Sequence, residues 1–430
     1  MYITQCLIAK NEEDNIEYCL SHLKSIVDEQ IVVDTGSTDR TVEIAKEHGA
    51  KVFYFDWIDD FSAARNFALS KAKGDWIIFL DCDEYFSEDS VNYIKDCIIK
   101  LGEKKNIDGL ICEMINIDSN KNITATVKNI SSRVFKRKEY LKYKNKVHEI
   151  LINTKASNSN LSLADASECL KIFHTGYAAE EVEKKNKNER NINLLKKELE
   201  KSPHDSKLNL YLSKQLNMEK RYEEALDYSL RASKYIDKTN IYDYYRIIYS
   251  NIMLNMVELS KPYEEIKSIF DDAVKEYSDY PDYYMYMGIV SFRDNRIKEA
   301  IDYLEKCIYY CENYKSIVEC FALGRIDEIY TNLLKAYLVD NNNLKVVELS
   351  VALLKVNKYD FEVLIILLNA FLSQEKEEDI ILFLSKIYDY NLLKDKIYLL
   401  KAGDKVKNKK LSNYYMSLLS EKELVLLKNS

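Results

Sequence analysis

The chain has 430 residues, of which 47% are hydrophobic and 31% are charged, and its formal net charge is −8. This composition excludes a disordered chain, and the acidic balance disfavours nucleic-acid binding, which requires a basic surface. No apolar stretch reaches the roughly 20 residues of a membrane span, and the first residues lack the features of a signal peptide, so we expect a cytoplasmic protein of two or three domains without a membrane span.

The cysteines exclude two common uses of this residue. There are nine of them, an odd number, and no Cys-x-x-Cys pair occurs. Neither a zinc cluster nor a disulfide framework is therefore indicated. Cys307 and Cys311 fall on one helical face, which indicates packing. We expect reduced and mostly buried thiols.

Short apolar runs alternate with amphipathic segments over the first 115 residues, a pattern that predicts a parallel sheet flanked by helices. The predicted strands cover residues 3–8, 30–34, 51–55 and 76–80. The predicted helices end near residue 23, cover 41–48, and extend from about 61 to 72. Polar residues follow each strand, as expected where a nucleotide binds an open sheet.

The turn after the first strand carries Lys10, Asn11 and Glu12 where a dinucleotide or phosphate-binding loop would carry glycines. Neither Gly-x-Gly-x-x-Gly nor Gly-Lys-Ser/Thr is present in this region. The negative charge of a phosphate must therefore be met by side chains or by a metal ion.

An apolar strand at 76–80 ends in Asp81-Cys82-Asp83-Glu84. Carboxylates at the carboxyl edge of a sheet suggest a divalent cation and an anionic substrate, because hard oxygen ligands suit magnesium or manganese (Mg2+ or Mn2+). Asp is also a common turn former, so the motif by itself leaves a purely structural role open.

Residues 105–178 contain shorter β segments at 109–115, 132–136 and 170–173. His148 and Glu149 follow the basic run 142–146, and His174 closes a strand. Two histidines near strand ends suggest a contribution to the metal site, although a histidine that serves only the structure fits the same spacing.

Everything beyond about residue 180 has a helical pattern with an internal repeat. The segment 222–228 recurs at 263–266 and 297–303, with weaker copies at 344–347 and 377–380. These spacings suit a helical-hairpin repeat of 34 residues with small insertions. We predict a tetratricopeptide-like array over 203–400, whose groove would bind a peptide or a partner chain.

Four motifs together resemble family-2 glycosyltransferases of the GT-A fold, over roughly residues 1–178. The motifs are Ile8-Ala9-Lys10-Asn11-Glu12, the segment 33–41 (Val-Asp-Thr-Gly-Ser-Thr-Asp-Arg-Thr), the segment from Trp57 to Asn66, and Asp81-Cys82-Asp83-Glu84. The resemblance implies an α/β GT-A (Rossmann-like, nucleotide-diphospho-sugar transferase) domain that uses a UDP-sugar donor.

The resemblance also implies a role for each matching residue. The expected nucleotide-sugar-binding residues are Ile8, Lys10 and Glu12 at the nucleoside, Asp34 and Asp60 at uracil or ribose, Arg65 at the diphosphate or the aspartates, and Asp81 with Cys82. The expected ligands of Mg2+ or Mn2+ are Asp83, Asp81 and His174. A helix-surface ion pair is the alternative role for Arg65.

The family's usual acidic base motif is not plainly present, which leaves the base open. An inverting displacement needs a base on the acceptor side, and Glu149 beside His148 is the candidate. A thiol acceptor, with an ordinary pKa of about 8.5, would lose its proton to a weaker base than an alcohol acceptor would.

The order of these segments, followed by Arg190-Asn191-Ile192-Asn193-Leu194 and helical repeats, is also similar to sublancin-type peptide S-glycosyltransferases of glycocin biosynthesis. That resemblance implies hexose transfer to a Cys thiol, or a Ser hydroxyl, of a peptide held in the groove of the repeats. The alternatives are transfer to a cell-surface polysaccharide or lipid-linked glycan, and a non-catalytic repeat scaffold.

The expected domain order is a GT-A domain at 1–178, a connecting helix at 179–202, the repeats at 203–400, and a helical segment at 401–430. The apolar runs 414–419 and 424–427 suit a C-terminal cap or a homodimer face.

Overall fold

The computed structural model describes residues 1–102, 107–117, 123–147, 149–156, 160–175, 181–236, 244–316 and 318–428. These residues divide into two compact units. The first comprises residues 1–259 with 315–319, and the second comprises 260–314 with 320–430. The predicted domain boundaries at 178, 202 and 400 follow sequence pattern, not this division, and stay a prediction.

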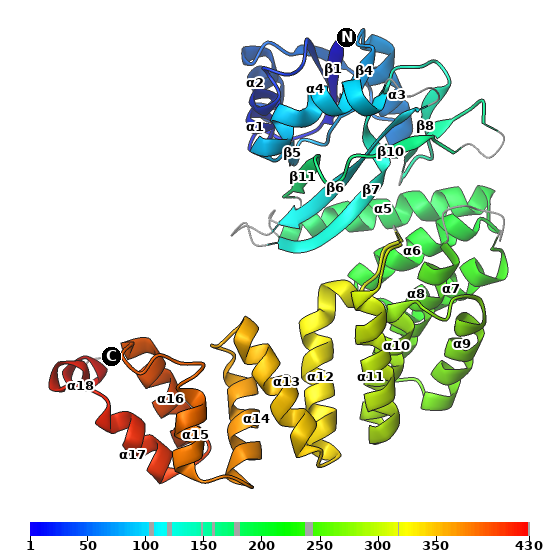
Figure 1. The fold of residues 1–430 in the computed structure, drawn as a ribbon. Helices are drawn as coiled ribbons and strands as arrows, with labels where there is room; N and C mark the ends of the chain where they lie inside the picture. Colours follow the sequence, from blue (N-terminus) through cyan, green and yellow to red (C-terminus); the bar gives the residue numbers. More distant parts are fainter. Residues whose placement is uncertain are drawn as a thin grey trace. The chain divides into compact units, whose positions relative to one another are not determined.

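The first unit is built on a mixed sheet whose first half has the predicted strands. They are β1 (Ile3–Ala9), β2 (Glu29–Asp34), β3 (Lys51–Tyr54) and β4 (Trp76–Phe79), in the order β3-β2-β1-β4 and all parallel (Figure 1). Parallel strands put their carboxyl ends on one edge of the sheet, so the ends of β1, β2 and β4 lie together there.

Helices cover both faces of these strands. The connecting helices are α1 (Ile16–His22), α2 (Thr41–Glu47) and α3 (Phe61–Lys71), and α4 (Glu88–Gly102) follows β5. One apolar cluster joins Leu7 and Ile78 to Leu20 and Ile94, on α1 and α4. A second joins Ile77 and Phe79 to Ala68 on α3, so β1, β2 and β4 are buried on both sides, whereas the edge strand β3 is partly exposed.

The second half of the sheet departs from the parallel pattern. The segment predicted as a strand at 132–136 is the end of β7 (Ile123–Lys136), which runs antiparallel to both β4 and β6 (Gly109–Ile117). Beyond β6 lie β11 (Lys171–His174), parallel to it, and then β5 (Glu84–Phe86), antiparallel to β11. Short β10 (Leu163–Asp165) also pairs with β6, and β8 (Leu141–Lys144) with β9 (Ile150–Asn153) forms a separate hairpin.

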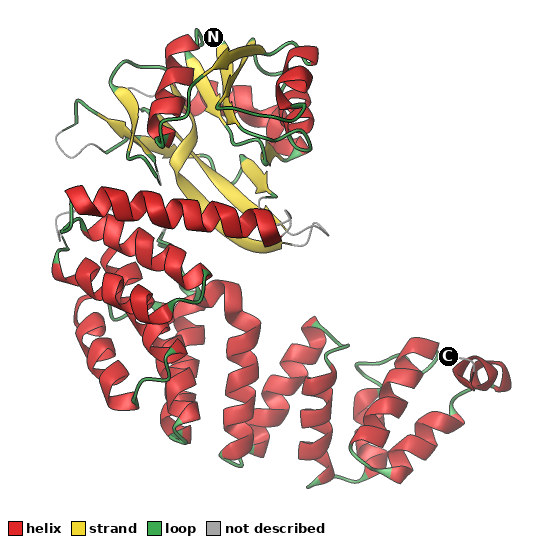
Figure 2. Ribbon diagram, turned by 180° about the vertical axis from the view of Figure 1, so that it is seen from behind, coloured by secondary structure: helices red, strands yellow, loops and turns green. Residues whose placement is uncertain are grey.

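All described strands precede residue 175, and the described chain beyond it consists of helices and loops (Figure 2). In the first unit these helices are α5 (Glu181–Lys201), α6 (Ser206–Met218), α7 (Tyr222–Lys234) and α8 (Tyr244–Glu258). Ile192 and Leu195 of α5 pack with Val147 of the sheet domain and Leu212 of α6 in one apolar cluster, which Phe61 also contacts. The helix after the sheet domain is therefore part of its core.

The second unit is helical. Its helices are α9 (Tyr263–Glu276), α10 (Pro281–Arg293), α11 (Ile297–Glu312), η1 (Ala322–Arg325), α12 (Ile326–Val339), α13 (Asn343–Val356), α14 (Phe361–Leu372), α15 (Glu377–Leu384), α16 (Leu393–Lys405), α17 (Lys409–Ser417) and α18 (Glu421–Lys428). Pro281 begins α10, where its missing N–H costs no hydrogen bond.

The repeat seen in the sequence marks every second α-helix from α7 to α15. The five segments at 222, 263, 297, 344 and 377 fall on α7, α9, α11, α13 and α15. The turn before the repeat helix often contains a residue in the left-handed region. Such residues are Lys220, Ser260, Asn295 and Asn341, with φ between 52° and 58°. The prediction of helical repeats after an α/β domain is thus confirmed.

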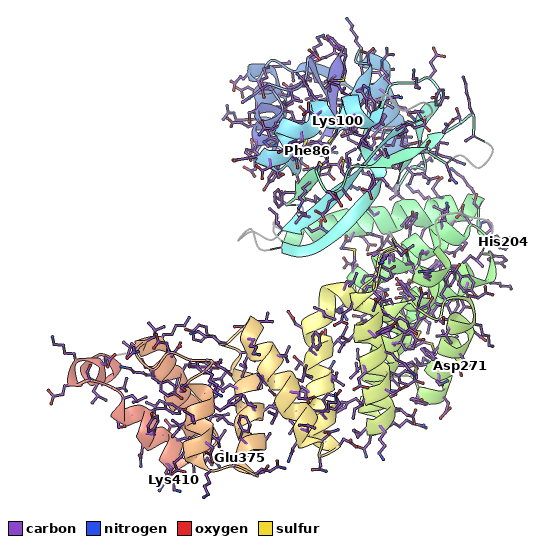
Figure 3. The ribbon with its side chains drawn as sticks, in the orientation of Figure 1. Phe86, Lys100, His204, Asp271, Glu375 and Lys410 are labelled. Carbon is purple, nitrogen blue, oxygen red and sulfur yellow. The ribbon has the colours of Figure 1, made fainter. Side chains whose placement is uncertain are left out.

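Burial follows this architecture (Figure 3). Phe86 lies in the core of the sheet domain, whereas Lys100, His204, Glu375 and Lys410 are exposed. The nine cysteines are free, and seven are buried, as predicted. Among the helices that the structure describes, none has the length and apolar character that a membrane crossing requires.

Candidate active site

A cleft of about 680 Å³ lies at the carboxyl edge of the parallel strands. It is lined by Ile8, Ala9, Lys10, Asn11, Glu12, Thr35, Trp57, Phe61, Arg65, Asp81, Cys82, Asp83, Arg133, Val147, Glu149, His174, Arg190 and Asn191. Nine of the twelve residues predicted for the site line this cleft. His148 lies outside the described residues, and Asp34 and Asp60 are not in the lining.

Arg65 of α3 joins two of the predicted carboxylates. Its Nη2 donates to Oδ1 of Asp81 at 2.7 Å, and its Nε donates to Oε1 of Glu149 at 2.6 Å. The side chain is only 5% exposed, and its guanidinium lies over the rings of Phe79 and Tyr143. A helix-surface ion pair is therefore excluded for Arg65, whose charge is buried among carboxylates and aromatic rings.

A second guanidinium, that of Arg133 on β7, completes this cluster. Its Nη2 donates to Oδ2 of Asp81 at 3.1 Å and to Oε1 of Glu84 at 2.5 Å. Burial by itself would raise the pKa of Asp81, but the charges of Arg65 and Arg133 lower it to about 2. Burial raises the pKa of Glu84 although Arg133 opposes it. Asp81 is thus a carboxylate held by two arginines, one at each oxygen.

Sequence reasoning placed Arg133 in a strand and gave it no role. The antiparallel register of β7, which sets Val134 opposite Ile78, brings Arg133 to the end of β4. No spacing in the sequence signals this register, because the two segments are joined through several intervening elements.

Asp83 and His174 come together through the pairing of β11. His174 lies opposite Glu84 of β5 and opposite Asn116 of β6. Its Nε2 is 3.4 Å from Oδ2 of Asp83, and its Nδ1 is 2.9 Å from Oδ1 of Asn116. Burial alone would lower the pKa of His174, but the hydrogen bond and charge of Asp83 raise it.

The residues predicted for the nucleoside side also line the cleft. Lys10 is exposed at the cleft and has no ion-pair partner among the described residues. Glu12 accepts a hydrogen bond from Nδ2 of Asn15 at 2.9 Å. Cys82 is buried, with Sγ 3.8 Å from the carbonyl oxygen of Ile8, and burial raises the pKa of its thiol far above the ordinary value. A protonated, buried thiol acts as a small packing group.

Asp34 and Asp60 have local partners. The carboxylate of Asp34 accepts from the backbone N–H of Gly36 and Ser37, both at 3.1 Å, and so shapes the turn after β2. Asp60 caps α3 by accepting from the backbone N–H of Ala63 at 2.9 Å. These contacts fix the turn and the helix that carry Thr35 and Arg65 into the cleft.

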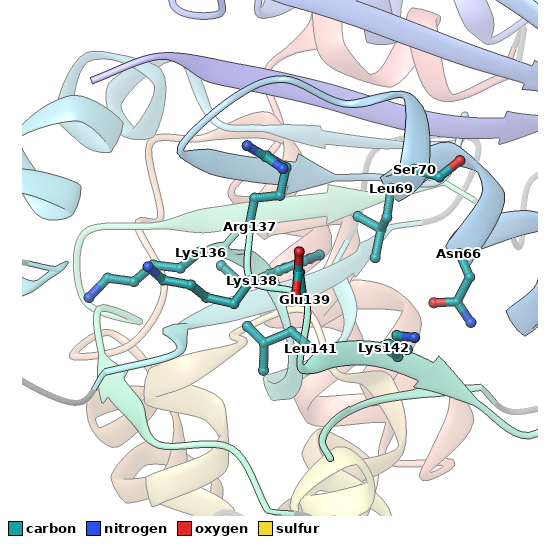
Figure 4. A pocket seen from close by; sticks show the side chains of 10 residues that line it. Asn66, Leu69, Ser70, Lys136, Arg137, Lys138, Glu139, Leu141 and Lys142 are labelled. Atoms are coloured by element: carbon teal, nitrogen blue, oxygen red, sulfur yellow. The ribbon is translucent and has the colours of Figure 1, made fainter. Parts of the chain in front are cut away.

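A smaller hollow of about 370 Å³ lies at the other edge of the sheet (Figure 4). Its lining includes apolar residues (Leu69, Phe135 and Leu141) and cationic residues (Lys136, Arg137, Lys138 and Lys142). Arg137 donates to the carbonyl oxygen of Gly74, before β4, whereas the candidate site follows β4. None of the predicted site residues lines this hollow.

Comparison with known proteins identifies the first part of the chain. Residues 5–156 match the model of the family described as "Glycosyl transferase family 2". This part of the chain is similar in sequence to that family. The predictions of a GT-A fold and of a glycosyltransferase domain are confirmed, and most of the residues that line the cleft at the carboxyl edge of β1 and β4 lie within the matched segment.

Curated relatives match this chain over part of their length. Glycosyltransferase SunS of Bacillus phage SPbeta is 31% identical over 240 residues, which are 55% of this chain and 54% of that protein. The TPR repeat-containing protein Synpcc7942_0270 of Synechococcus elongatus is 54% identical over 82 residues, 19% of this chain and 20% of that protein. The chain thus spans about half, or less, of the length of these relatives.

Solved structures match each part of the chain. One is glucosyl-3-phosphoglycerate synthase from Mycobacterium tuberculosis, in complex with Mn2+, uridine diphosphate and glucosyl-3-phosphoglycerate. It is 25% identical, aligns with 27% of this chain and 44% of its own, and has a TM-score of 0.22. YrrB, a TPR protein with an unusual peptide-binding site, is 16% identical and aligns with 52% of this chain and 97% of its own, with a TM-score of 0.35.

Proposed function

We propose that the protein is a metal-dependent, inverting glycosyltransferase that moves a hexose from a UDP-sugar to a side chain of a peptide. The observation that carries the proposal is the cleft itself. It gathers an aspartate held by two arginines, a glutamate that shares one of those arginines, and an Asp–His pair, and most of its lining lies in the segment that the glycosyltransferase family model matches. These are the parts that sugar transfer from a nucleoside diphosphate needs.

Asp83 and His174 are the residues that would hold Mg2+ or Mn2+. Their nearest atoms are 3.4 Å apart, close enough to bind one ion from adjacent positions. The described residues contain no group of three or more metal-ligating side chains, and a magnesium site does not need one, because water and substrate phosphates complete its shell. When bound, the ion would neutralise the charge that grows on the diphosphate as it leaves.

Asp81 has a different part in this proposal. Both of its oxygens accept from arginines, so it would hold Arg65 and Arg133 in place and reach a metal-bound water or the ribose only with some rearrangement. Asp81 would then position the two arginines of the cleft, and Asp83 would bind the metal ion.

Glu149 is the proposed base. Its Oε1 accepts from Arg65, and its Oε2 has no hydrogen-bond partner among the described residues. In the proposed step the acceptor sulfur or oxygen forms a bond to the anomeric carbon, the bond from that carbon to the diphosphate oxygen breaks, and the acceptor proton passes to Glu149. Attack from the face opposite the leaving group inverts the anomeric centre.

The acceptor is proposed to be a peptide that carries a Cys or Ser. The SunS match supports this, because the order of motifs resembles sublancin-type peptide S-glycosyltransferases. Helical repeats support it as well, since such arrays present long surfaces that bind extended peptides. The described helices α6 to α17 supply such repeats within each unit.

The experiment is transfer with the purified full chain. UDP-glucose, UDP-N-acetylglucosamine and UDP-galactose would each be incubated with Mn2+ and a cysteine-containing peptide, and the peptide's mass gain measured. A matched peptide with Ser in place of Cys separates S- from O-transfer. Transfer to a lipid-linked sugar, with both peptides unmodified, would contradict the peptide acceptor. Failure to bind UDP or any UDP-sugar would contradict the catalytic proposal altogether.

A further inference from the structure

The cationic side chains of the cleft fall into two groups. Arg65 and Arg133 are each paired with two carboxylates at 2.5 to 3.1 Å. Lys10 and Arg190 line the same cleft and have no ion-pair partner within 4 Å among the described residues. The first two therefore serve to hold the cleft together, whereas the other two present positive charge that is free to meet an anion.

Arg190 rests on an aromatic pair at the cleft. Its guanidinium lies 5.2 Å from the centroid of the Phe61 ring, and Phe61 packs edge-on against Trp57 with centroids 4.8 Å apart. Partial burial lowers the pKa of Arg190, with the charge of Asp59 opposing, and arginine remains charged throughout the physiological range. An aromatic face fixes a guanidinium in orientation and leaves its N–H groups available in the plane.

The helix that carries Arg190 is anchored in the core of the first unit. Ile192 and Leu195 of α5 are fully buried, and they pack with Val147, which stands two residues before the proposed base. Arg190 and Asn191 thus belong to a helix that packs against the cleft wall.

Asn191 supplies an independent observation. It lines the cleft, and its Oδ1 is buried without a hydrogen-bond partner among the described residues. A buried amide oxygen without a donor is unfavourable, because it has lost its hydrogen bonds to water and gained none in the protein. A ligand hydroxyl in the cleft would supply the missing donor.

We propose that Arg190 and Asn191 bind the donor substrate, with the guanidinium on the diphosphate oxygens and the amide oxygen on a hydroxyl of the ribose or the sugar. This inference rests on the proposed function, because it names further residues for the same donor. The proposed donor site thus extends beyond residues 5–156, which the family model matches. Its further residues lie on α5, which the predicted domain boundary at 178 assigns to a connecting helix.

The test compares UDP with uridine, by calorimetry on the full chain in the presence of Mn2+. The Arg190→Ala variant should bind UDP about 10- to 100-fold more weakly, the range expected for loss of a charged hydrogen-bond pair, and uridine nearly as well as before. Arg190→Lys should recover part of the UDP affinity because it keeps the charge. Asn191→Ala should weaken UDP binding if the partner is a ribose hydroxyl, and UDP-sugar binding alone if the partner is on the sugar.

Lys138→Ala is the matched control, because it removes an exposed cation from the second hollow of the same domain. It should leave the affinity for UDP unchanged. Equal UDP binding by wild type and Arg190→Ala would overturn the role of Arg190. An equal loss of affinity for uridine and for UDP in both Arg190 variants would also overturn it, because a contact to the diphosphate affects UDP and not uridine. If the wild type binds no UDP at all, the proposed function fails and not merely this extension of it.

Discussion

Nη2 of Arg65 donates to Oδ1 of Asp81 across 2.7 Å, in the interior of the cleft wall. The same guanidinium donates to Glu149 at 2.6 Å. One buried side chain on α3 therefore sets the distance between the aspartate motif after β4 and the proposed base before β9. Because a guanidinium is planar and donates in fixed directions, this arrangement fixes geometry as well as charge.

Arg65→Lys is expected to separate geometry from charge. A lysine keeps the positive charge but cannot donate to Asp81 and Glu149 in two fixed directions, so kcat/KM for sugar transfer should fall at least 100-fold. Arg65→Met removes the charge, which leaves the mostly buried Glu149 without its cationic partner and Asp81 with Arg133 alone, and should lower the free energy of unfolding by about 3–5 kcal/mol in urea titration. The surface variant Arg40→Lys is the control, since Arg40 makes only an exposed pair with Glu43. Wild-type activity in Arg65→Lys would contradict the positioning role.

Asp395 of α16 provides a prediction on the helical unit alone. Its carboxylate is fully buried and accepts from Nζ of Lys358 at 2.7 Å, from the Tyr359 hydroxyl at 2.6 Å and from the backbone N–H of Asp389 at 2.8 Å. Burial would raise the pKa of Asp395, but these hydrogen bonds and the lysine charge lower it below its ordinary value.

A pKa lowered by folding means that ionised Asp395 stabilises the native state above its unfolded pKa of about 3.9, and that this contribution is lost as the pH falls through the lower native pKa. Asp395→Asn should therefore reduce the free energy of unfolding by about 2 kcal/mol at pH 7 and by less near pH 3. Chemical unfolding at both pH values measures the difference. Asp404→Asn, on the exposed face of the same helix, should change little at either pH. A pH-independent loss in Asp395→Asn would contradict the ionic contribution.

The alternation of apolar strands with amphipathic helices predicted β1 to β4 to within a residue or two, because buried parallel strands carry a strong local signal. The same holds for the repeat helices, where an alanine such as Ala225 or Ala300 recurs at the helix contact. The second half of the sheet was not predictable in this way. Antiparallel β7 and three-residue β5 depend on partners far along the chain, which no local pattern reports.

In the site, too, residues placed by local sequence were predictable and residues placed by distant contacts were not. Spacing at strand ends predicted that Asp81 and Lys10 would reach one edge of the sheet, and the structure brings both to the cleft. It could not predict that Asp60 turns its carboxylate to cap α3, since a cap and a ligand contact use the same side chain. Arg133 and Arg190 reach the cleft only through tertiary packing.

Asp83→Asn should abolish metal binding while the fold persists. The variant keeps the side-chain volume and loses the charge that a hard cation requires, so the affinity for Mn2+ should fall at least 100-fold in titration calorimetry. Removal of metal from the wild type by a chelator should lower sugar transfer to a similar level, and added Mn2+ should restore it in the wild type only. Asp89→Asn, an exposed aspartate in the first turn of α4, is the matched control. Full transfer activity of Asp83→Asn with a chelator present would remove metal from the proposal.

Glu149→Gln tests the acceptor half of the reaction separately from the donor half. A glutamine can still accept from Nε of Arg65 through its amide oxygen, so the cleft should keep its shape and UDP should bind as in the wild type. Without a carboxylate, no group takes the acceptor proton from this position, and kcat for transfer should fall about 10²- to 10⁴-fold.

The loss of kcat should be smaller for a Cys acceptor than for a Ser acceptor at pH 8.5 and above, because a thiol then ionises without a base. Glu139→Gln, on the exposed side of the same domain, should transfer sugar at the wild-type rate. If kcat is unchanged in Glu149→Gln with both acceptors, Glu149 is not the base, and another group removes the acceptor proton.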